Sequence, residues 1–439
     1  MGSSIVPAGK SPSEERLESG TGDARAASAA PVSLDRFVLR YGVYCLIGFA
    51  LLNGWMFWKL RDSILQGYGD FASFYPAGQA VRSGDSARLY EAGLQRKLQE
   101  QFPASVRGRR GPLPYIRPPF EALLFVPFSY LKYAPACIVW AAIKIILLLV
   151  AAGILSNIRE RERGISNYGL ILLLSLAFFP VAYDLIVGQD SILLLLIMAV
   201  GLKRLVRGKE LECGAVLALG LFKFHLMIPM VAIFALRKKG KLVVGFLAMA
   251  TVLVMISWMM VGTAGLRFYP RYLWTLNRVP ELGMVQVRNM PNLRGLLSSV
   301  LGNGTYPEAA HWFLGAMVVV GIGVASRSWR GDDRDSVIAA FCFSIVITLA
   351  TSYYANGYDL TLLLVPLVLL GNAFFRRREI SGWPRMLFLG SAAGLLFTPL
   401  LWALMLRVQQ FRWVGIVVLG LAISIPAAEK YRRQIAESD

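Results

Sequence analysis

Apolar runs recur along the chain from residue 38 to residue 428 and are separated by short polar turns. Runs of about twenty apolar residues with few charges are typical of helices that cross a lipid bilayer. The pattern therefore predicts an all-α, polytopic integral membrane protein with about twelve transmembrane helices. The predicted spans lie near residues 38–60, 119–132, 134–157, 167–187, 190–206, 212–236, 241–262, 308–327, 336–353, 358–375, 386–406 and 412–428.

Two long polar intervals and two polar tails interrupt this pattern. Residues 61–117 contain turn residues, a helical stretch and a basic, proline-rich stretch, and residues 263–306 form the second interval. Residues 1–33, rich in Ser, Ala and Gly, predict a disordered tail, and residues 431–439 form a second tail. We expect a single transmembrane domain over residues 34–430, with the two intervals as its large loops.

The composition agrees with a membrane protein and narrows its chemistry. Of the 439 residues, 56% are hydrophobic and 17% are charged, and the mean hydropathy is +0.54. The four cysteines lie in apolar segments at spacings that match no zinc site. Neither an HExxH pattern nor a GxxxxGK[ST] loop is present, so we expect no metal, no other cofactor and no ATP-driven pump.

The distribution of charge predicts an orientation. The chain carries +19, from 46 Lys and Arg against 27 Asp and Glu. In a soluble protein this excess would suggest nucleic acid, but no recognition module is visible and the basic residues gather in short loops, so the expected partners are membrane lipids and not nucleic acid. We expect a multi-pass protein of the inner (plasma) membrane. The positive-inside rule places both of its termini in the cytoplasm, and both long intervals and YYANGYD (353–359) outside. The clusters that mark the cytoplasmic side are Arg237–Lys241, Arg327–Arg334, Arg376–Arg378 and Lys430–Arg433, with Arg36 and Arg40.

Two further basic clusters conflict with twelve simple crossings. RERER (159–163) and KRLVRGK (203–209) would then lie outside, whereas the positive-inside rule wants both in the cytoplasm. The conflict disappears if the segments 119–132 and 212–236 are broken or re-entrant, and GQD (188–190) then moves outside. We favour this alternative.

Some ionisable residues fall inside the apolar segments. A charge at the centre of a span costs about 2.5–3.5 kcal/mol, so each of these residues needs a partner or a function. Lys144 either snorkels or pairs within the bundle. Lys223 either faces a phosphate or forms an internal ion pair, and the sequence leaves these alternatives open. The full set is Glu121, Lys144, Asp184, Lys223, His225 and Asp359.

The first long interval opens with GYGDFASFYPAGQAVRSG (67–84), in which Asp70 stands at the membrane edge. In a transfer from a lipid-linked sugar the leaving lipid phosphate is good, whereas the attacking hydroxyl is a poor nucleophile. One carboxylate within hydrogen-bond reach can take the hydroxyl proton, while cations hold the phosphate and aromatic rings cover the sugar. Asp70 therefore suits a general base. The alternative is a cap of the helix that the pattern predicts over 71–82.

The ordered set of motifs resembles glycosyltransferase family 87. The likeness begins with DFASFYPAGQAVRSGDSARLY (70–90) and YIRPPFEALLFVPFSYL (115–131) and covers most of residues 65–370. It continues through GQDSILLLL (188–196), GAVLALGLFKFHLMIP (214–229), NMPNLRGLL (289–297) and YDLTLLLVP (358–366). The chain departs from the family pattern at Lys223-Phe224, where Lys-Pro is common. Tyr358 and Asp359 stand where some members carry histidines.

The resemblance implies a fold and an activity. The fold is a GT-C-like helical bundle with short helices along the membrane surface in the first outer loop. The activity is an inverting transfer of mannose from a polyprenyl-phosphate donor to a lipid or glycan acceptor, with Asp70 as the catalytic base and without a metal. The residues that we expect to contact substrate are Tyr75, Tyr115, Arg117, Gln189, Lys223, Asn292, Arg294, Tyr358 and Asp359, with Phe74 and Arg288 as further contacts.

Two other classes of protein compete with this interpretation. A membrane transporter or lipid flippase would show two halves related by internal repetition, with discontinuous helices at matching places. The sequence shows no such symmetry, and the interval 61–117 has no counterpart in the second half. A non-catalytic membrane scaffold would make Asp70 replaceable without chemical consequence.

Overall fold

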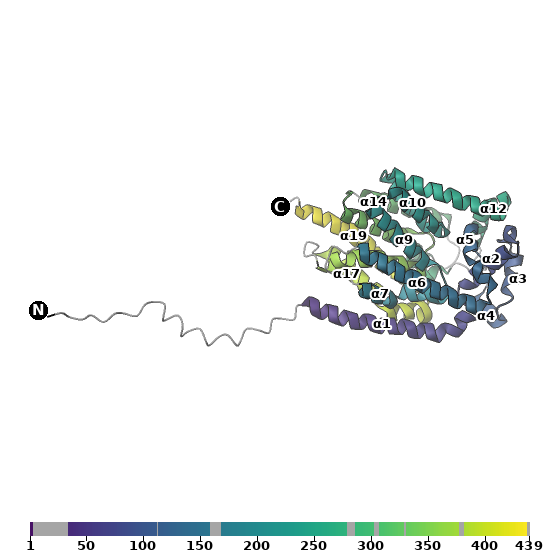
Figure 1. The fold of residues 1–439 in the computed structure, drawn as a ribbon, viewed down its shortest axis with the longest axis horizontal. Coiled ribbons are helices and arrows are strands. Elements are labelled where there is room, and N and C mark those ends of the chain that lie inside the picture. Colours follow the sequence, from purple (N-terminus) through teal and green to yellow (C-terminus); the bar gives the residue numbers. More distant parts are fainter. Residues whose placement is uncertain are drawn as a thin grey trace. The chain divides into compact units, whose positions relative to one another are not determined.

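The computed structural model describes residues 1–2, 34–111, 113–158, 168–278, 286–302, 307–328, 331–376 and 382–436. Every regular element within these ranges is a helix, as predicted. The chain divides into two compact units, residues 1–47 and 48–439, and helix α1 (Leu34–Leu65) crosses the division between them. The account below concerns the larger unit (Figure 1).

The helices agree with a multi-pass membrane protein but not with a count of twelve. Seven helical segments in the described residues are long and apolar enough to cross a bilayer, and nine are if two bent pairs each count as one span. The seven are Tyr41–Leu65, Tyr133–Ile158, Glu210–Leu236, Gly240–Leu276, Glu308–Ser328, Arg334–Thr351 and Phe411–Ala428. The bent pairs are α7 (Tyr168–Ala177) with α8 (Phe179–Val187), at 64°, and α17 (Trp383–Leu396) with the segment Thr398–Val408, at 59°.

The segment 119–132 does not span the membrane, so this predicted helix is wrong. It forms α5 (Pro119–Phe125) and the short helix η2 (Pro127–Tyr130). Seven residues of α-helix extend only about 10 Å. Proline supplies the physical reason, because it is favoured at the first turn of a helix and cannot continue one. Pro119 and Pro127 each start a new element here.

The segment 210–236 folds back on itself. It consists of α10 (Glu210–Ala218), the 3₁₀ turn η3 (Leu219–Lys223) and α11 (Phe224–Leu236). A straight helix of this length would extend about 40 Å. Instead the ion pair between Lys239 and Glu210, at 3.1 Å, brings its two ends together. Although its length would allow a crossing, the segment is a re-entrant hairpin with η3 at its tip.

The basic loops gather at the open end of this hairpin. Lys239 also pairs with Asp332 at 2.8 Å, and the Arg334 guanidinium donates to the carbonyl of Ile158. The ends of α6 (Tyr133–Ile158), α10, α11 and α15 (Arg334–Thr351) therefore meet. This agrees with the alternative topology that the basic clusters favour. The cluster at 159–163 lies outside the described residues.

The first long loop is a helical cap at one end of the bundle (Figure 1, right). It holds α2 (Phe71–Arg82), η1 (Ser86–Arg88), α3 (Ala92–Gln99) and α4 (Ala104–Arg110). Aromatic side chains join it to the rest, since the ring of Phe74 stacks 4.8 Å from that of Phe125. Tyr90 lies 5.0 Å from Tyr269 in α12 (Gly240–Arg278), beyond a break at Gly262. The first loop thus packs on the start of the second.

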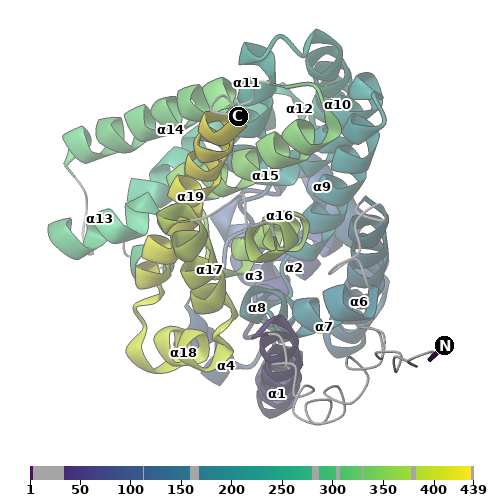
Figure 2. The same ribbon diagram turned by 90° about the vertical axis from the view of Figure 1, so that its left-hand side faces the viewer.

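The remaining helices frame one central turn. The short helix η6 (Gly357–Leu363) packs against α8 and α9 (Ser191–Val206) and leads into α16 (Leu364–Arg376). Figure 2 shows α16 surrounded by other helices of the bundle. Helix α15 packs between α14 (Glu308–Ser328) and α19 (Val414–Ala436). The second long loop contributes two short elements that contact each other, η5 (Val287–Asn289) and α13 (Leu293–Leu301).

Candidate active site

Asp70 stands at the start of α2 and points its carboxylate away from that helix. Its side chain makes no capping hydrogen bond, so the helix-cap alternative is wrong. The carboxylate instead accepts a hydrogen bond of 2.7 Å from the Gln189 side-chain amide. The backbone carbonyl of Asp70 accepts from the Ser73 hydroxyl, which holds the first turn of α2. Asp70 is half-buried and lines the cavity described below.

Two glycines allow the segment of Asp70 to approach the segment of Gln189. A Cβ atom on Gly69 would lie 2.7 Å from the carbonyl oxygen of Val187, and one on Gly188 would lie 2.6 Å from the Cβ of Phe71. Gly188 also has φ 77°, a left-handed conformation that glycine adopts without strain as it ends α8. Any larger residue at either position would push the two segments apart.

A cavity of about 560 Å³ opens in front of Asp70. Polar and apolar side chains both line it, and Asp70 is the sole acidic side chain among the described residues that do so. The polar lining residues are Ser63, Tyr68, Asp70, Ser73, Arg117, Tyr183, Gln189, Gln286, Arg288, Asn289, Tyr354, Asn356, Tyr358 and Gln409. The apolar lining residues include Leu60 and Ile64 of α1, Ile186 of α8, and Trp402, Met405 and Leu406 near the C-terminal end.

Arg117 sits behind Gln189 and is engaged by protein groups. Its guanidinium donates to the Gln189 side-chain oxygen at 2.8 Å and pairs with Asp190 at 3.0 Å. It also donates to the carbonyl of Phe222, at the tip of the re-entrant hairpin, at 3.3 Å. Only 6% of Arg117 is exposed. It therefore connects the first loop, the α8–α9 turn and the hairpin.

Lys223 continues this network into the interior. Its ammonium group pairs with Asp190 at 2.7 Å and with Asp359 at 2.6 Å, and it also donates to the Ser191 hydroxyl. Lys223 is fully buried and does not line the cavity. Of the two alternatives that the sequence leaves open, the internal ion pair is correct. Lys144 likewise pairs with Asp184, at 3.2 Å.

Four of these residues, Arg117, Asp190, Lys223 and Asp359, form what we call the charge cluster. Two cations face two carboxylates, so the cluster is neutral overall. Asp359 additionally accepts from the backbone N–H of Asn356 at 2.8 Å, which fixes the start of η6. Neutral, hydrogen-bonded clusters of this kind avoid the large cost of an unpaired buried charge.

Burial and neighbouring charges set the protonation of the acids around the cluster. Burial raises the pKa of Asp70 above its ordinary value, while the Gln189 hydrogen bond and Arg117 oppose that rise. Burial, followed by the repulsion of Asp190, raises the pKa of Glu121 well above its ordinary value. At Asp190 burial is outweighed by Arg117 and Lys223, which together lower its pKa. The two shifts have opposite directions and favour a proton on Glu121 over one on Asp190, although Glu121 also lies 3.9 Å from the Arg117 guanidinium.

The predicted substrate contacts fall into two groups. Asp70, Arg117, Gln189 and Tyr358 line the cavity, with Lys223 and Asp359 directly behind them. Asn292 instead caps α13 and donates to the carbonyl of Ser352 at 2.9 Å. The remaining three also lie off the cavity and donate to backbone carbonyls: Tyr75 to Leu131, Tyr115 to Pro118 and Arg294 to Tyr353.

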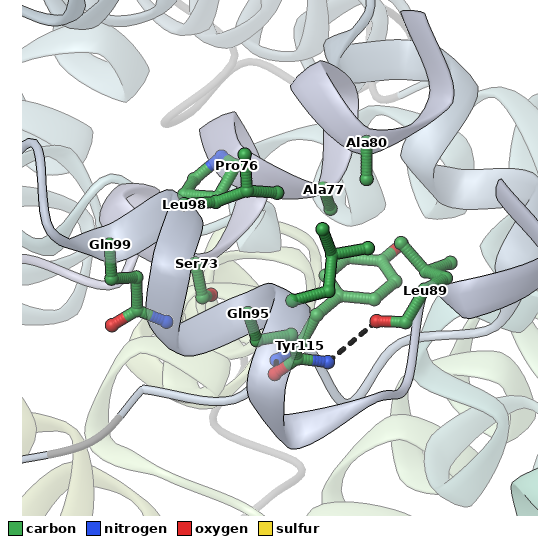
Figure 3. A pocket seen from close by; sticks show the side chains of 10 residues that line it. Ser73, Pro76, Ala77, Ala80, Leu89, Gln95, Leu98, Gln99 and Tyr115 are labelled. Atoms are coloured by element: carbon green, nitrogen blue, oxygen red, sulfur yellow. Dashed lines mark hydrogen bonds between the residues drawn. The ribbon is translucent and has the colours of Figure 1, made fainter. Parts of the chain in front are cut away.

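Tyr115 illustrates why aromatic residues of the first loop do not all reach substrate. It lies under α2 and α3 among Ala77, Leu89 and Gln95 (Figure 3). Its hydroxyl contacts Glu121 at 3.2 Å. Tyr115 is thus a packing residue whose hydroxyl also donates a hydrogen bond to the buried Glu121.

Sequence reasoning overlooked several residues of the cavity and its support. Asp190 belongs to the GQD motif, but only the structure shows that it joins Arg117 to Lys223. Trp402, Met405 and Gln409 come from the last quarter of the chain and complete the cavity wall. No motif in that part of the sequence signals this role.

Comparison with known families now identifies the chain. The model of glycosyltransferase family 87 matches residues 115–352, which is more than half of the chain. The chain belongs to glycosyltransferase family 87. It is therefore a membrane glycosyltransferase. No curated protein and no solved structure gives a significant match.

The extent of the family match bears on how the site is interpreted. Residues 115–352 include Arg117, Gln189, Asp190 and Lys223 of this glycosyltransferase. Asp70 precedes the matched residues, so the family match does not extend to it.

Proposed function

We propose that this family 87 glycosyltransferase moves a sugar, mannose by its resemblance, from a polyprenyl-phosphate donor to a lipid or glycan acceptor. The transfer takes place on the extracytoplasmic side and inverts the anomeric centre. The observation that carries the proposal is the position of Asp70. It presents the one carboxylate among the described lining residues to a cavity that is lined by both polar and apolar side chains.

Asp70 acts as the general base. The acceptor hydroxyl attacks the anomeric carbon, and its proton passes to the Asp70 carboxylate. The bond between the anomeric carbon and the phosphate oxygen breaks at the same time, and the polyprenyl phosphate leaves with the electron pair. Attack opposite to the leaving group inverts the anomeric centre. A second carboxylate is not required, because the phosphate leaves without protonation.

The donor phosphate binds at Arg288. Arg117 and Arg288 are the two cationic side chains among the described residues of the cavity wall. Arg117 is already bound to Gln189 and Asp190, whereas Arg288 makes no hydrogen bond or ion pair with any described residue. Asn289 lies next to it on the same wall. An unpaired, partly exposed guanidinium in a cavity wall is suited to bidentate recognition of phosphate.

The prenyl chain lies on apolar side chains of the wall. Leu60 and Ile64 come from the end of α1, and Met405 and Leu406 come from the segment before α19. Transfer of an isoprenoid chain from bilayer to such a wall exchanges one apolar environment for another. The polar head of the donor is thereby directed towards Asp70 and Arg288.

Replacement of Asp70 tests the proposal. Asp70→Asn keeps the shape and the hydrogen-bonding capacity of the side chain but removes the base, so we expect turnover of polyprenyl-phosphate-mannose in detergent to fall by at least about 100-fold. Asp62→Asn, which changes an exposed carboxylate on α1, is the matched control and should keep wild-type turnover. Arg288→Gln should raise the KM for the donor. Near-normal turnover in a folded Asp70→Asn enzyme would eliminate the base, and lipid movement without glycosylated product would favour a transporter.

A further inference from the structure

Gln189 occupies the space between the proposed base and the charge cluster. Its amide nitrogen donates to Asp70 at 2.7 Å, and its amide oxygen accepts from Arg117 at 2.8 Å. The two neighbours fix the orientation of the amide, because a carboxylate requires a donor and a guanidinium requires an acceptor. Gln189 is 5% exposed. We propose that Gln189 is a positioning residue that holds the Asp70 carboxylate in place and ties it to the charge cluster.

The turn that carries Gln189 is built to stay still. The Gly188 carbonyl accepts from the Trp140 indole at 3.0 Å, and the Ser191 N–H donates to the Asp184 carboxylate at 2.8 Å. Asp184 is itself held by Lys144. The residues on both sides of Gln189 are therefore anchored by the bundle. A side chain on so rigid a turn can fix the direction of its partner.

The other end of the connection is equally fixed. Arg117 binds Asp190 of the same turn, and Asp190 binds Lys223 at the tip of the re-entrant hairpin. Lys223 in turn binds Asp359 of η6. Four segments that are distant in sequence thus meet in the charge cluster, and Arg117 of that cluster holds the Gln189 amide oxygen.

The hydrogen bond also affects when Asp70 can accept a proton. A donor to the carboxylate favours the ionised form, so Gln189 lowers the pKa of Asp70 against the effect of burial. The charged and titratable groups that face Asp70 are Arg117, Asp190, Lys223, Tyr183, Tyr354 and Tyr358. The tyrosines are neutral at acidic pH and do not change this balance. Loss of the Gln189 donor therefore lets burial raise the pKa of Asp70 further.

Gln189→Leu tests the inference, which rests on the proposed role of Asp70. We expect kcat to fall by about tenfold or more and the acidic limb of the pH–rate profile to move to higher pH. The KM for polyprenyl-phosphate-mannose should stay within about twofold, because a positioning residue leaves donor binding intact. If the acidic limb of the pH–rate profile does not move, the inference is overturned. If the KM for the donor also rises in that case, Gln189 is a substrate contact instead.

A second measurement does not depend on activity. Diazo reagents esterify protonated carboxyl groups, so the modification of Asp70, followed by peptide mass spectrometry across pH, reports its titration directly. The midpoint should move to higher pH in Gln189→Leu, and a wild-type midpoint would overturn the inference. If Asp70→Asn were active, the base assignment would fail, yet this titration would still show whether Gln189 and Asp70 are coupled.

A matched control separates positioning from simple loss of stability. Gln95 of α3 is also a buried glutamine with two bonds: its amide nitrogen donates to the Leu89 carbonyl at 2.7 Å (Figure 3), and its oxygen accepts from the Tyr115 N–H at 3.0 Å. Gln95→Leu should lower thermal stability without moving the Asp70 midpoint. If Gln189→Leu does not fold, Gln189→Glu keeps the side-chain shape and places a carboxylate beside Asp70, so the midpoint should again move to higher pH. A wild-type midpoint there would also overturn the inference.

Discussion

At the scale of single residues, the site depends on which charges are already used. Arg117 and Lys223 are cations within or next to the cavity, yet both are bound to carboxylates. In the proposed function, Arg288 is therefore the cation that binds the phosphate, and Asp70 is the carboxylate that accepts the proton. Which charged side chains are free for substrate depends on the ion pairs within the protein, and no sequence motif reveals these pairs. The sequence predicts Asp70, Arg117 and Gln189 in the site but cannot tell a substrate contact from a support.

Glu121 provides a test of the protonation pattern. One oxygen of Glu121 is buried without a hydrogen-bond partner, and the side chains of Glu121 and Asp190 lie within hydrogen-bonding reach of each other. A proton on Glu121 can therefore be donated in a hydrogen bond to Asp190. Glu121→Gln keeps a donor in this place, so its thermal stability at neutral pH should match that of the wild type. Glu121→Ala removes the hydrogen bonds of Glu121 with Asp190 and Tyr115 and should cost about 1–3 kcal/mol.

The pH dependence has a definite sign. The pKa of Glu121 is raised in the folded protein, so its contribution to stability is complete below the ordinary pKa of glutamate and is lost as the pH rises towards the raised value. Thermal unfolding in detergent should show this decline in the wild type but not in Glu121→Gln. Equal destabilisation by the Gln and Ala variants would instead indicate that an ionised Glu121 serves Arg117.

At the scale of elements, the re-entrant hairpin delivers Lys223 to the charge cluster, and α12 holds the hairpin in place. Gly214 of α10 and Gly245 of α12 let these helices touch. A Cβ atom on Gly214 would lie 1.9 Å from the Leu242 carbonyl oxygen, and one on Gly245 would lie 2.1 Å from that of Leu211. Small residues permit such close backbone contact between helices in membranes.

Gly214→Ala should therefore separate α10 from α12 and displace the tip of the hairpin. We expect a lower melting temperature in detergent, by several degrees for an overpacking cost of about 1–3 kcal/mol, together with lower turnover. Gly315→Ala is the matched control, because Gly315 lies within α14 and a Cβ atom there meets open space. Its stability should be unchanged or slightly higher, since alanine is the better helix former. Equal effects of the two substitutions would refute the close-contact role.

The elements also show where sequence patterns succeed and fail. The positions of α6 and α15 follow from apolar runs, because lipid imposes the same requirement on every span. The run at 119–132 is also apolar, but Pro119 and Pro127 each start a new short element, and side chains such as Leu124 and Tyr130 are exposed. Hydropathy alone does not reveal that such a run is too broken to span. Similarly, the wall formed by Trp402 and Met405 depends on a 59° bend that composition does not reveal.

At the scale of the whole molecule, the hairpin decides which ends of the helices share a side. If 210–236 crossed the membrane, the loops around Arg207 and Lys239 would lie on opposite sides. The ion pairs of Lys239 with Glu210 and Asp332 instead keep these loops together. The basic loops then form one face, and the first loop with the cavity belongs to the other. We expect the basic face to be cytoplasmic, as the positive-inside rule requires.

Cysteine labelling tests this topology. In a Cys45→Ser background, which removes the one exposed native thiol of the described residues, Glu100→Cys should react with a membrane-impermeant maleimide on intact cells. Arg207→Cys should react only after permeabilisation, because the Glu210–Lys239 ion pair joins this loop to the basic face, which we expect to be cytoplasmic. Twelve simple crossings predict the reverse for residue 207. Labelling of Arg207→Cys from outside would show that the basic face is on the exterior. The cavity with Asp70 and the α8–α9 turn would then face the cytoplasm, which would contradict transfer on the extracytoplasmic side.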